Sequence, residues 1–152
     1  MRMSNNSSRV EENMHLMKTL DDAWNSQDWD TFSKRHTDNV VVRWPGGQPP
    51  TNGIDAHKKE GEYFFKAFPD NHGGNNPYKT LFGQGDWTCS IAVFTGTHKG
   101  EMMGLDGKMI PPTNKTFKVD FCTVARWNND GKIVEENIFY DQIGMMTQLG
   151  VM

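Results

Sequence analysis

Residues 116–127 read TFKVDFCTVARW, in which apolar and polar side chains alternate. A period of two places successive side chains on opposite faces of a β-strand, so this segment is predicted to be a long strand covered on one face. The covered face is expected to carry Phe117, Val119, Phe121, Thr123, Ala125 and Trp127. The rest of the sequence can be arranged around this strand.

A hairpin and a helix are predicted to follow it. Asn129-Asp130-Gly131 suits a tight reversal, and Ile133–Tyr140 is predicted to return as a second strand. Asp141 has the side-chain acceptor of a helix N-cap, and Gly150 suits the end of that terminal helix.

The chain before this hairpin predicts mixed structure. Apolar side chains at helical spacing predict a first helix over about Arg9–Ser26, with Ser8 as its N-cap. Further segments are expected in this order: a short helix capped by Asp28, a strand Val40–Trp44, a helix from Gly53 to before Pro69, a loop Asp70–Tyr78, and strands Tyr78–Gln84 and Trp87–His98.

This order of elements predicts the α+β class, with a curved antiparallel sheet wrapped around the N-terminal helices. Such a sheet leaves a cone-shaped gap between itself and the helices. The 152 residues are expected to form one domain, 1–152, with a flexible start over residues 1–8.

Composition narrows the class of partner. The net charge of −3 and 23% charged residues give no basic stripe, which argues against nucleic acid. We find no signal peptide and no apolar run long enough for a membrane span, so a soluble, cytoplasmic protein is expected. No metal-ligand spacing is evident, and neither a metal nor a cofactor is predicted.

Several short motifs occur together in a fixed order. They resemble those of the SnoaL-like polyketide cyclases, also called ester cyclases, of the nuclear transport factor 2-like superfamily, over about residues 10–150. The motifs are Phe68-Pro69-Asp70, Gly85-Asp86, Gly96-Thr97-His98 with Gly100, Pro111-Pro112-Thr113, Arg126, Asp130-Gly131-Lys132-Ile133, Glu135, Asp141 and Gln148-Leu149-Gly150.

This resemblance implies the same α+β cone, with the gap as a ligand pocket. It also implies cofactor-independent acid-base chemistry by a pocket aspartate, whose position is taken here by Ile138. The family's pocket histidine and glutamine fall on Thr123 and Phe121, and a pocket aromatic on the first helix falls on Trp24. With Trp44 and Tyr140 added, these residues are expected to form an apolar wall for a flat ligand, or simply a core.

Three other residues are candidates for catalysis. Glu136 shares a strand face with Ile138 and stands about 6.6 Å from it along the strand, although it could instead lie at a solvated mouth. His98 could relay protons or make a structural hydrogen bond, and Asp141 could act as an acid or only cap its helix. The remaining histidines, His15, His36, His57 and His72, are expected at the surface.

The leading hypothesis is a SnoaL-like protein that binds a hydrophobic or aromatic small molecule and catalyses cyclisation, isomerisation or dehydration. The alternatives are a binding protein without chemistry and a protein-interaction domain with a filled pocket. The methionine-rich loop Met102–Asn114 is expected to form a lid. Ala92, Phe94, Val124 and Phe139 are expected outside the pocket, where they predict a homodimer formed through the sheet.

Overall fold

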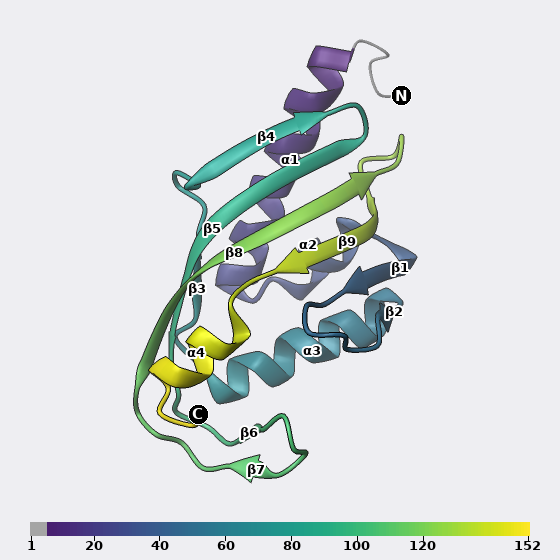
Figure 1. Ribbon diagram of the computed structural model, residues 1–152. Helices are drawn as coiled ribbons and strands as arrows, with labels where there is room; N and C mark the ends of the chain where they lie inside the picture. Colours follow the sequence, from purple (N-terminus) through teal and green to yellow (C-terminus); the bar gives the residue numbers. More distant parts are fainter. Residues whose placement is uncertain (1–5) are drawn as a thin grey trace.

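A strongly curved sheet wraps around helices in the computed structural model of the protein, which describes residues 6–152 (Figure 1). This arrangement confirms the predicted α+β class. The elements are, in chain order, α1 (Asn6–Ser26), α2 (Trp29–Lys34), β1 (His36–Arg43), β2 (Thr51–Asn52), α3 (Ile54–Ala67), β3 (His72–Gly74), β4 (Thr80–Gln84), β5 (Trp87–Thr97), β6 (Met102–Met103), β7 (Met109–Ile110), β8 (Thr116–Trp127), β9 (Ile133–Phe139) and α4 (Gln142–Gln148).

The main sheet follows from the predicted hairpin. Within residues 6–152 its strand order is β2-β1-β9-β8-β5-β3, and β4 also pairs with β5. Strand β8 pairs with β9 across a turn in which Gly131 has a φ of 74°, a conformation that glycine adopts without strain. The pair β1 and β9 is parallel, unlike the antiparallel pairs elsewhere in this sheet.

Strand β1 is longer than the predicted Val40–Trp44, and its pairing with β9 is interrupted. His36 pairs with Ile133, and the next paired residue, Val41, is opposite Glu135. The extra residues form a bulge, which breaks the period of two and hides the start of the strand from sequence reading. The bulge leaves His36 and Val40 both buried.

Helix α1 begins earlier than predicted. It includes Ser8, so the predicted N-cap at Ser8 is wrong, and residues 6–8 of the expected flexible start are helical. Residues 1–5 of that start lie outside the described residues. Arg9 forms an ion pair with Asp86 at 2.7 Å and a hydrogen bond with Asn129, which tie this end of the helix to two hairpin turns.

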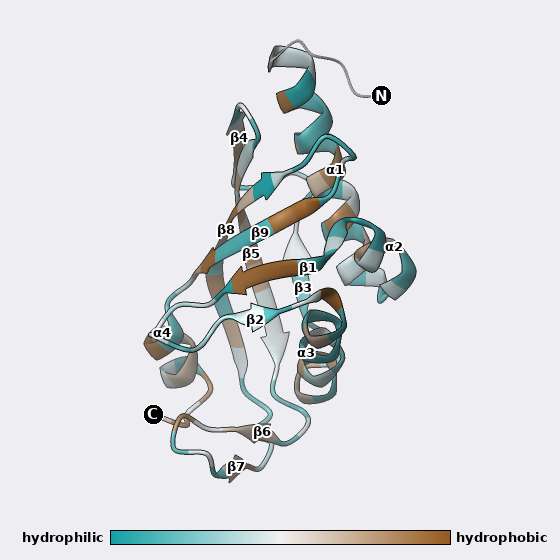
Figure 2. Cartoon of the chain, turned by 90° about the vertical axis from the view of Figure 1, so that its right-hand side faces the viewer, coloured by the Kyte–Doolittle hydropathy of each residue, from teal (hydrophilic) through white to brown (hydrophobic). Residues whose placement is uncertain are grey.

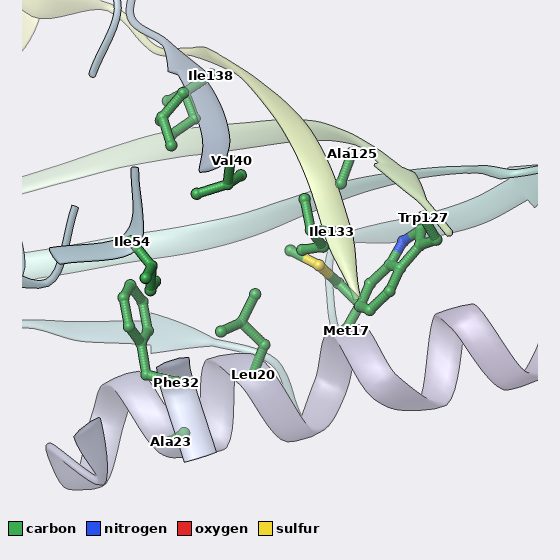
Figure 3. Packing of buried hydrophobic residues seen from close by; sticks show 11 residues of the cluster. Met17, Leu20, Ala23, Phe32, Val40, Ile54, Ala125, Trp127, Ile133 and Ile138 are labelled. Carbon is green, nitrogen blue, oxygen red and sulfur yellow. The ribbon is translucent and has the colours of Figure 1, made fainter. Parts of the chain in front are cut away.

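The inner face of β8 is buried as the alternation predicts. Met17 and Leu20 reach from α1 toward Ala125 of β8 and Ile133 of β9, as Figure 3 shows. The prediction for Ala92 and Phe94 was wrong: both are buried on the inner face of β5, because alternation separates two faces without saying which one is covered.

Two apolar clusters fill the space under the sheet. One joins α1, β1, β8 and β9, and the other joins β5, β8, α4 and the end of α3. Trp24, Phe121 and Tyr140 pack against both clusters, so they mark the region between them. In Figure 2 the middle of β1 is strongly hydrophobic, whereas α1 and α3 carry hydrophilic surfaces. Over residues 6–152 we find no helix with the length and apolar character needed to cross a membrane.

Two predicted loops contain short strands. The segment Asp70–Tyr78 includes β3, which pairs with β5. The segment Met102–Asn114 includes the ribbon β6–β7, and none of its residues lines the cavity described below. The expectation of a lid is therefore corrected: Met102 is buried in the second cluster, and the backbone N–H of Met103 donates to the Tyr63 hydroxyl at 3.0 Å.

Candidate functional site

A cavity of about 740 Å³ lies between the concave face of the sheet and the helices α1 and α3. This volume is within the range of small-molecule sites. Most of the lining side chains are apolar. They include Met17, Leu20, Trp24, Phe32, Trp44, Tyr63, Phe64, Ala92, Phe94, Phe121, Ile138, Tyr140 and Met145.

Aromatic rings form one wall of this cavity. Phe121 and Tyr140 are stacked, with ring centroids 5.4 Å apart and 23° between their planes. Trp24 donates its indole N–H to the side-chain oxygen of Asn71 at 2.7 Å, which fixes the ring. A flat apolar ligand would find parallel aromatic surfaces here.

Three buried polar residues meet at another part of the wall. His36 begins β1, His57 lies on α3, and Glu136 lies on the inner face of β9. Their exposed fractions are 1%, 5% and 4%. Because His57 and Glu136 also line the cavity, the cluster is available to a bound molecule.

Hydrogen bonds hold both imidazole rings in place. The Nδ1–H of His36 donates to the carbonyl oxygen of Phe32 at 2.7 Å, and its Nε2 contacts Glu136 Oε1. The Nδ1 of His57 is 3.2 Å from Glu60 Oε1, and its Nε2 is 3.5 Å from Glu136 Oε1. Both Nε2 atoms therefore face the same carboxylate oxygen.

Two members of this cluster have strongly shifted pKa values. Burial alone would raise the pKa of Glu136, but the charges and hydrogen bonds of His36 and His57 hold this pKa well below its usual range. Burial alone would lower the pKa of His57, but the Glu136 and Glu60 carboxylates raise it to about 9. At neutral pH, Glu136 is thus a carboxylate and His57 an imidazolium.

A chain of hydrogen bonds extends from the cluster. Glu60 Oε2 accepts from the Thr51 hydroxyl at 2.8 Å, and the Thr51 oxygen accepts from the Trp44 indole N–H at 2.9 Å. Through this chain a cavity-wall tryptophan is linked to His57.

A second carboxylate enters the cavity from α1. Asp21 lines the cavity and accepts a hydrogen bond from the hydroxyl of Tyr78. Desolvation raises the pKa of Asp21 to about 7, although the Tyr78 hydrogen bond opposes the rise. Burial also raises the pKa of Tyr78, so the phenol stays protonated at neutral pH. Asp21 can therefore exchange a proton near neutral pH.

The structure brings all six predicted pocket residues together. The cavity is lined by Trp24, Trp44, Phe121, Thr123, Ile138 and Tyr140, and Glu136 lies beside them rather than at a solvated mouth. Trp44 and Ile138 line the cavity without filling it, which does not fit the expectation of a filled pocket.

The other two predicted catalytic residues lie elsewhere. His98 is fully buried beside Phe68, and its Nδ1 accepts from the backbone N–H of Thr113 at 3.2 Å. Asp141 caps α4 by accepting from the Gly144 N–H at 2.8 Å. Neither residue lines the cavity.

Sequence reading missed His36, His57 and Asp21. The expectation that His36 and His57 lie at the surface was wrong, since the β1 bulge and the close packing of α3 bury them. For His57 a signal existed, because it follows Ile54 by three residues on the apolar side of its helix. For Asp21 a similar signal existed, because it follows Met17 by four residues and precedes Trp24 by three on the apolar side of α1.

The chain is similar to a known protein family and to several solved structures. A family model described as SnoaL-like polyketide cyclase matches residues 14–149. A SnoaL-like candidate polyketide cyclase from Jannaschia sp. CCS1 is similar in structure, with a TM-score of 0.83 and 20% identity over 99% of both chains.

Two further solved structures share the fold. IdmH, a candidate polyketide cyclase from Streptomyces antibioticus, is 25% identical with a TM-score of 0.74, over 91% of this chain and 99% of the other. A protein of ketosteroid isomerase-like fold from Catenulispora acidiphila DSM 44928, in complex with trimethylamine, is 14% identical with a TM-score of 0.72, over 90% of this chain and 93% of the other. Among curated proteins, none matches this sequence.

Proposed function

Because the chain belongs to the SnoaL-like polyketide cyclase family, we propose that it binds a flat hydrophobic or aromatic carbonyl compound and catalyses proton transfer on it. The observation that carries this proposal is a largely apolar cavity lined by a carboxyl group with a pKa of about 7, Asp21. The reaction would be a cyclisation, an isomerisation or a dehydration, each of which moves a proton beside a carbonyl group.

Asp21 is the proposed general base and acid. A group whose pKa lies near the working pH can both remove a proton from carbon and return it. Glu136 is less suited to this role, because the two imidazoles stabilise its charged form. Tyr78 would hold the Asp21 carboxyl in place.

The His36–His57–Glu136 cluster has a different proposed role. The imidazolium of His57 supplies positive charge to the cavity wall, where it would stabilise a substrate oxygen that gains negative charge. Glu136 would then act as a positioning residue that holds both rings.

The test uses a panel of aromatic ketones. Quenching of tryptophan fluorescence measures binding of each ketone, and mass spectrometry detects any product. We expect Asp21→Asn to reduce turnover at least about 100-fold while ligands still bind. The matched control is Asp22→Asn, because Asp22 is the exposed neighbour that pairs with Lys18. Equal activity of the wild type and Asp21→Asn would overturn the assignment of the base.

A second candidate function is ligand binding without chemistry. It is favoured by Ile138, which stands in the cavity wall where the resemblance places the family's catalytic aspartate. Quenching of fluorescence by the panel, with no product from any bound compound, would support this candidate.

We also propose that the protein works in the cytoplasm as one domain per chain and as a homodimer. The outer face of the sheet carries exposed or half-buried apolar side chains that a partner could cover. They are Phe82, Trp87, Ile91, Val124 and Phe139. Ala92 and Phe94 point inward, so they are not part of this interface, although the sequence predicted them there.

A further inference from the structure

The geometry points to a divalent transition-metal site formed by His36 Nε2, His57 Nε2 and Glu136 Oε1. Each of the three residues offers one ligand atom within 4.8 Å of the other two, and all three residues are buried. Metal-ligand bonds of about 2.1 Å hold neighbouring ligand atoms of a tetrahedral site about 3.4 Å apart. The spacing of 3.5 Å between His57 Nε2 and Glu136 Oε1 already meets this requirement. His36 Nε2 and Glu136 Oε1 are in direct hydrogen-bond contact and would have to move apart to admit the ion, while the two imidazoles would approach from no more than 4.8 Å.

The surroundings of both imidazoles match those of metal ligands. A metal-binding histidine usually donates its other ring N–H to a carboxylate or a backbone carbonyl, which fixes the ring and its tautomer. His36 makes this contact with the carbonyl of Phe32, and His57 makes it with Glu60. Each Nε2 is thereby directed toward the centre of the cluster, and a cation that binds there would displace the Nε2 proton of the His57 imidazolium and take up the lone pair.

The donor set selects the class of metal. Two imidazoles and one carboxylate suit Zn²⁺, Fe²⁺ or Co²⁺, whereas Mg²⁺ and Ca²⁺ prefer oxygen ligands. Three protein ligands also leave at least one coordination position open. Because His57 and Glu136 line the cavity, that position would face a bound molecule and could accept a carbonyl oxygen.

The three ligands come from distant parts of the sequence. His57 follows His36 by 21 residues, and Glu136 follows His36 by 100, so no short motif announces the cluster. This is why the sequence predicted no metal. The inference deepens the proposed function, because a bound metal ion would take the place of the His57 imidazolium as the positive charge that stabilises a substrate oxygen.

The test uses the full-length protein, treated with a chelator and dialysed, and then titrated with ZnCl₂ in a calorimeter. We expect one Zn²⁺ per chain and a melting temperature that rises with Zn²⁺ and returns with the chelator. Titration with CoCl₂ should produce the visible absorption of Co²⁺ bound to nitrogen and oxygen. Absence of saturable Zn²⁺ binding in the wild type would overturn the inference without recourse to any variant.

Variants locate the binding site. We expect His57→Asn and Glu136→Gln to remove the cobalt absorption, and Glu60→Gln to weaken Zn²⁺ binding about 10- to 100-fold, as loss of a ring-orienting partner does. The control is His72→Asn, because His72 is exposed and is neither a member of the cluster nor part of the cavity lining. Circular dichroism checks that each variant is folded. Binding that survives both ligand variants, or that His72→Asn weakens equally, would contradict the site.

The outcome is independent of the proposed function, on which the inference otherwise rests. Metal titration needs no substrate, so a protein that binds Zn²⁺ and turns nothing over would retain the metal site and lose the catalytic proposal. An active protein without metal affinity would retain the proposed proton transfer by Asp21 and lose the metal site.

Discussion

Glu136 shows how one side chain can hold several elements together. Its carboxylate on β9 contacts one imidazole from β1 and another from α3. Removing its charge leaves two buried rings without their shared partner, which costs more than losing an exposed ion pair. The residue is therefore expected to matter for stability as well as for chemistry.

We predict that Glu136→Gln lowers the free energy of unfolding by about 3 kcal/mol, measured by urea denaturation. Glu135→Gln is the control, because Glu135 pairs at the surface with Arg43 at 2.7 Å and Arg126 at 2.8 Å. That change should cost less than about 1 kcal/mol. Equal losses for the two variants would show that the buried cluster contributes no more to stability than an exposed ion pair.

Asp21 is expected to make the stability of the protein depend on pH. Its pKa rises from 3.8 in the unfolded chain to about 7 in the folded one, so folding disfavours its charged form. The corresponding stability is complete at acid pH and is lost as the pH rises from about 4 to about 7.

The measurement is the unfolding free energy of the wild type and Asp21→Asn from pH 4 to pH 8. Relative to the variant, the wild type should lose on the order of 2 kcal/mol over this range, after allowance for solvent screening. The difference between the two proteins isolates Asp21 from carboxylates such as Glu136, whose lowered pKa values act in the opposite direction. A constant difference across the range would contradict the raised pKa.

The apolar part of the site and Glu136 could be predicted from the sequence, whereas His36, His57 and Asp21 were missed. Phe121, Thr123, Ile138 and Tyr140 lie on strands whose period of two assigns their face. His36 lies before a bulge, where that period fails. Which histidine of several becomes buried depends on long-range packing, which local pattern does not contain.

At the scale of the element, α3 approaches α1 and α2 through a glycine. A Cβ atom at Gly61 would lie 2.7 Å from a ring carbon of Trp29 and 2.9 Å from one of Trp24, closer than atoms can pack. The glycine therefore permits the close contact that puts His57 in the cluster and Trp24 in the cavity wall.

We predict that Gly61→Ala destabilises the protein by about 1–3 kcal/mol, although alanine favours a helix by about 1 kcal/mol over glycine. Thermal denaturation measures the loss, and the fluorescence of Trp24 and Trp29 should change with it. Glu62→Ala, at the exposed neighbouring position, should have an effect near zero. Stabilisation by Gly61→Ala would mean that helix propensity outweighs the steric contact.

The elements that the sequence predicted well are those whose signals are local. The hairpin of β8 and β9 and the Asp141 cap of α4 depend on alternation, a turn glycine and one side-chain acceptor. The strand β3 has the sequence His-Gly-Gly and is held by pairing with β5 and by the Asn25 side chain of α1, so nothing local could reveal it. The parallel pairing of β1 with β9 is likewise a property of the assembled sheet.

At the scale of the whole molecule, the outer face of the sheet is an exposed apolar surface that a partner could cover. Phe139 is 55% exposed there, and Ile91 lies two strands away, with Cys122 between them. Large apolar side chains gathered on one face suggest an interface.

We predict a dimer at micromolar concentration in sedimentation equilibrium, and a folded monomer for Phe139→Lys. The lysine places a charge in the apolar interface while leaving the inner face of β9 unchanged. Asn39→Lys, at an exposed position of β1, is the control and should remain dimeric. A monomeric wild type would count against the interface.

The parallel pairing of β1 with β9 also fixes when the cavity can exist during synthesis. His36 and Glu136 are separated by 100 residues, and the chain must close this long loop before they meet. A nascent chain that ends before residue 133 lacks β9, the strand that joins β1 and β2 to the rest of the sheet. The charged cluster is therefore completed only after the β8–β9 hairpin has left the ribosome, and its formation can serve as a marker that this sheet has closed.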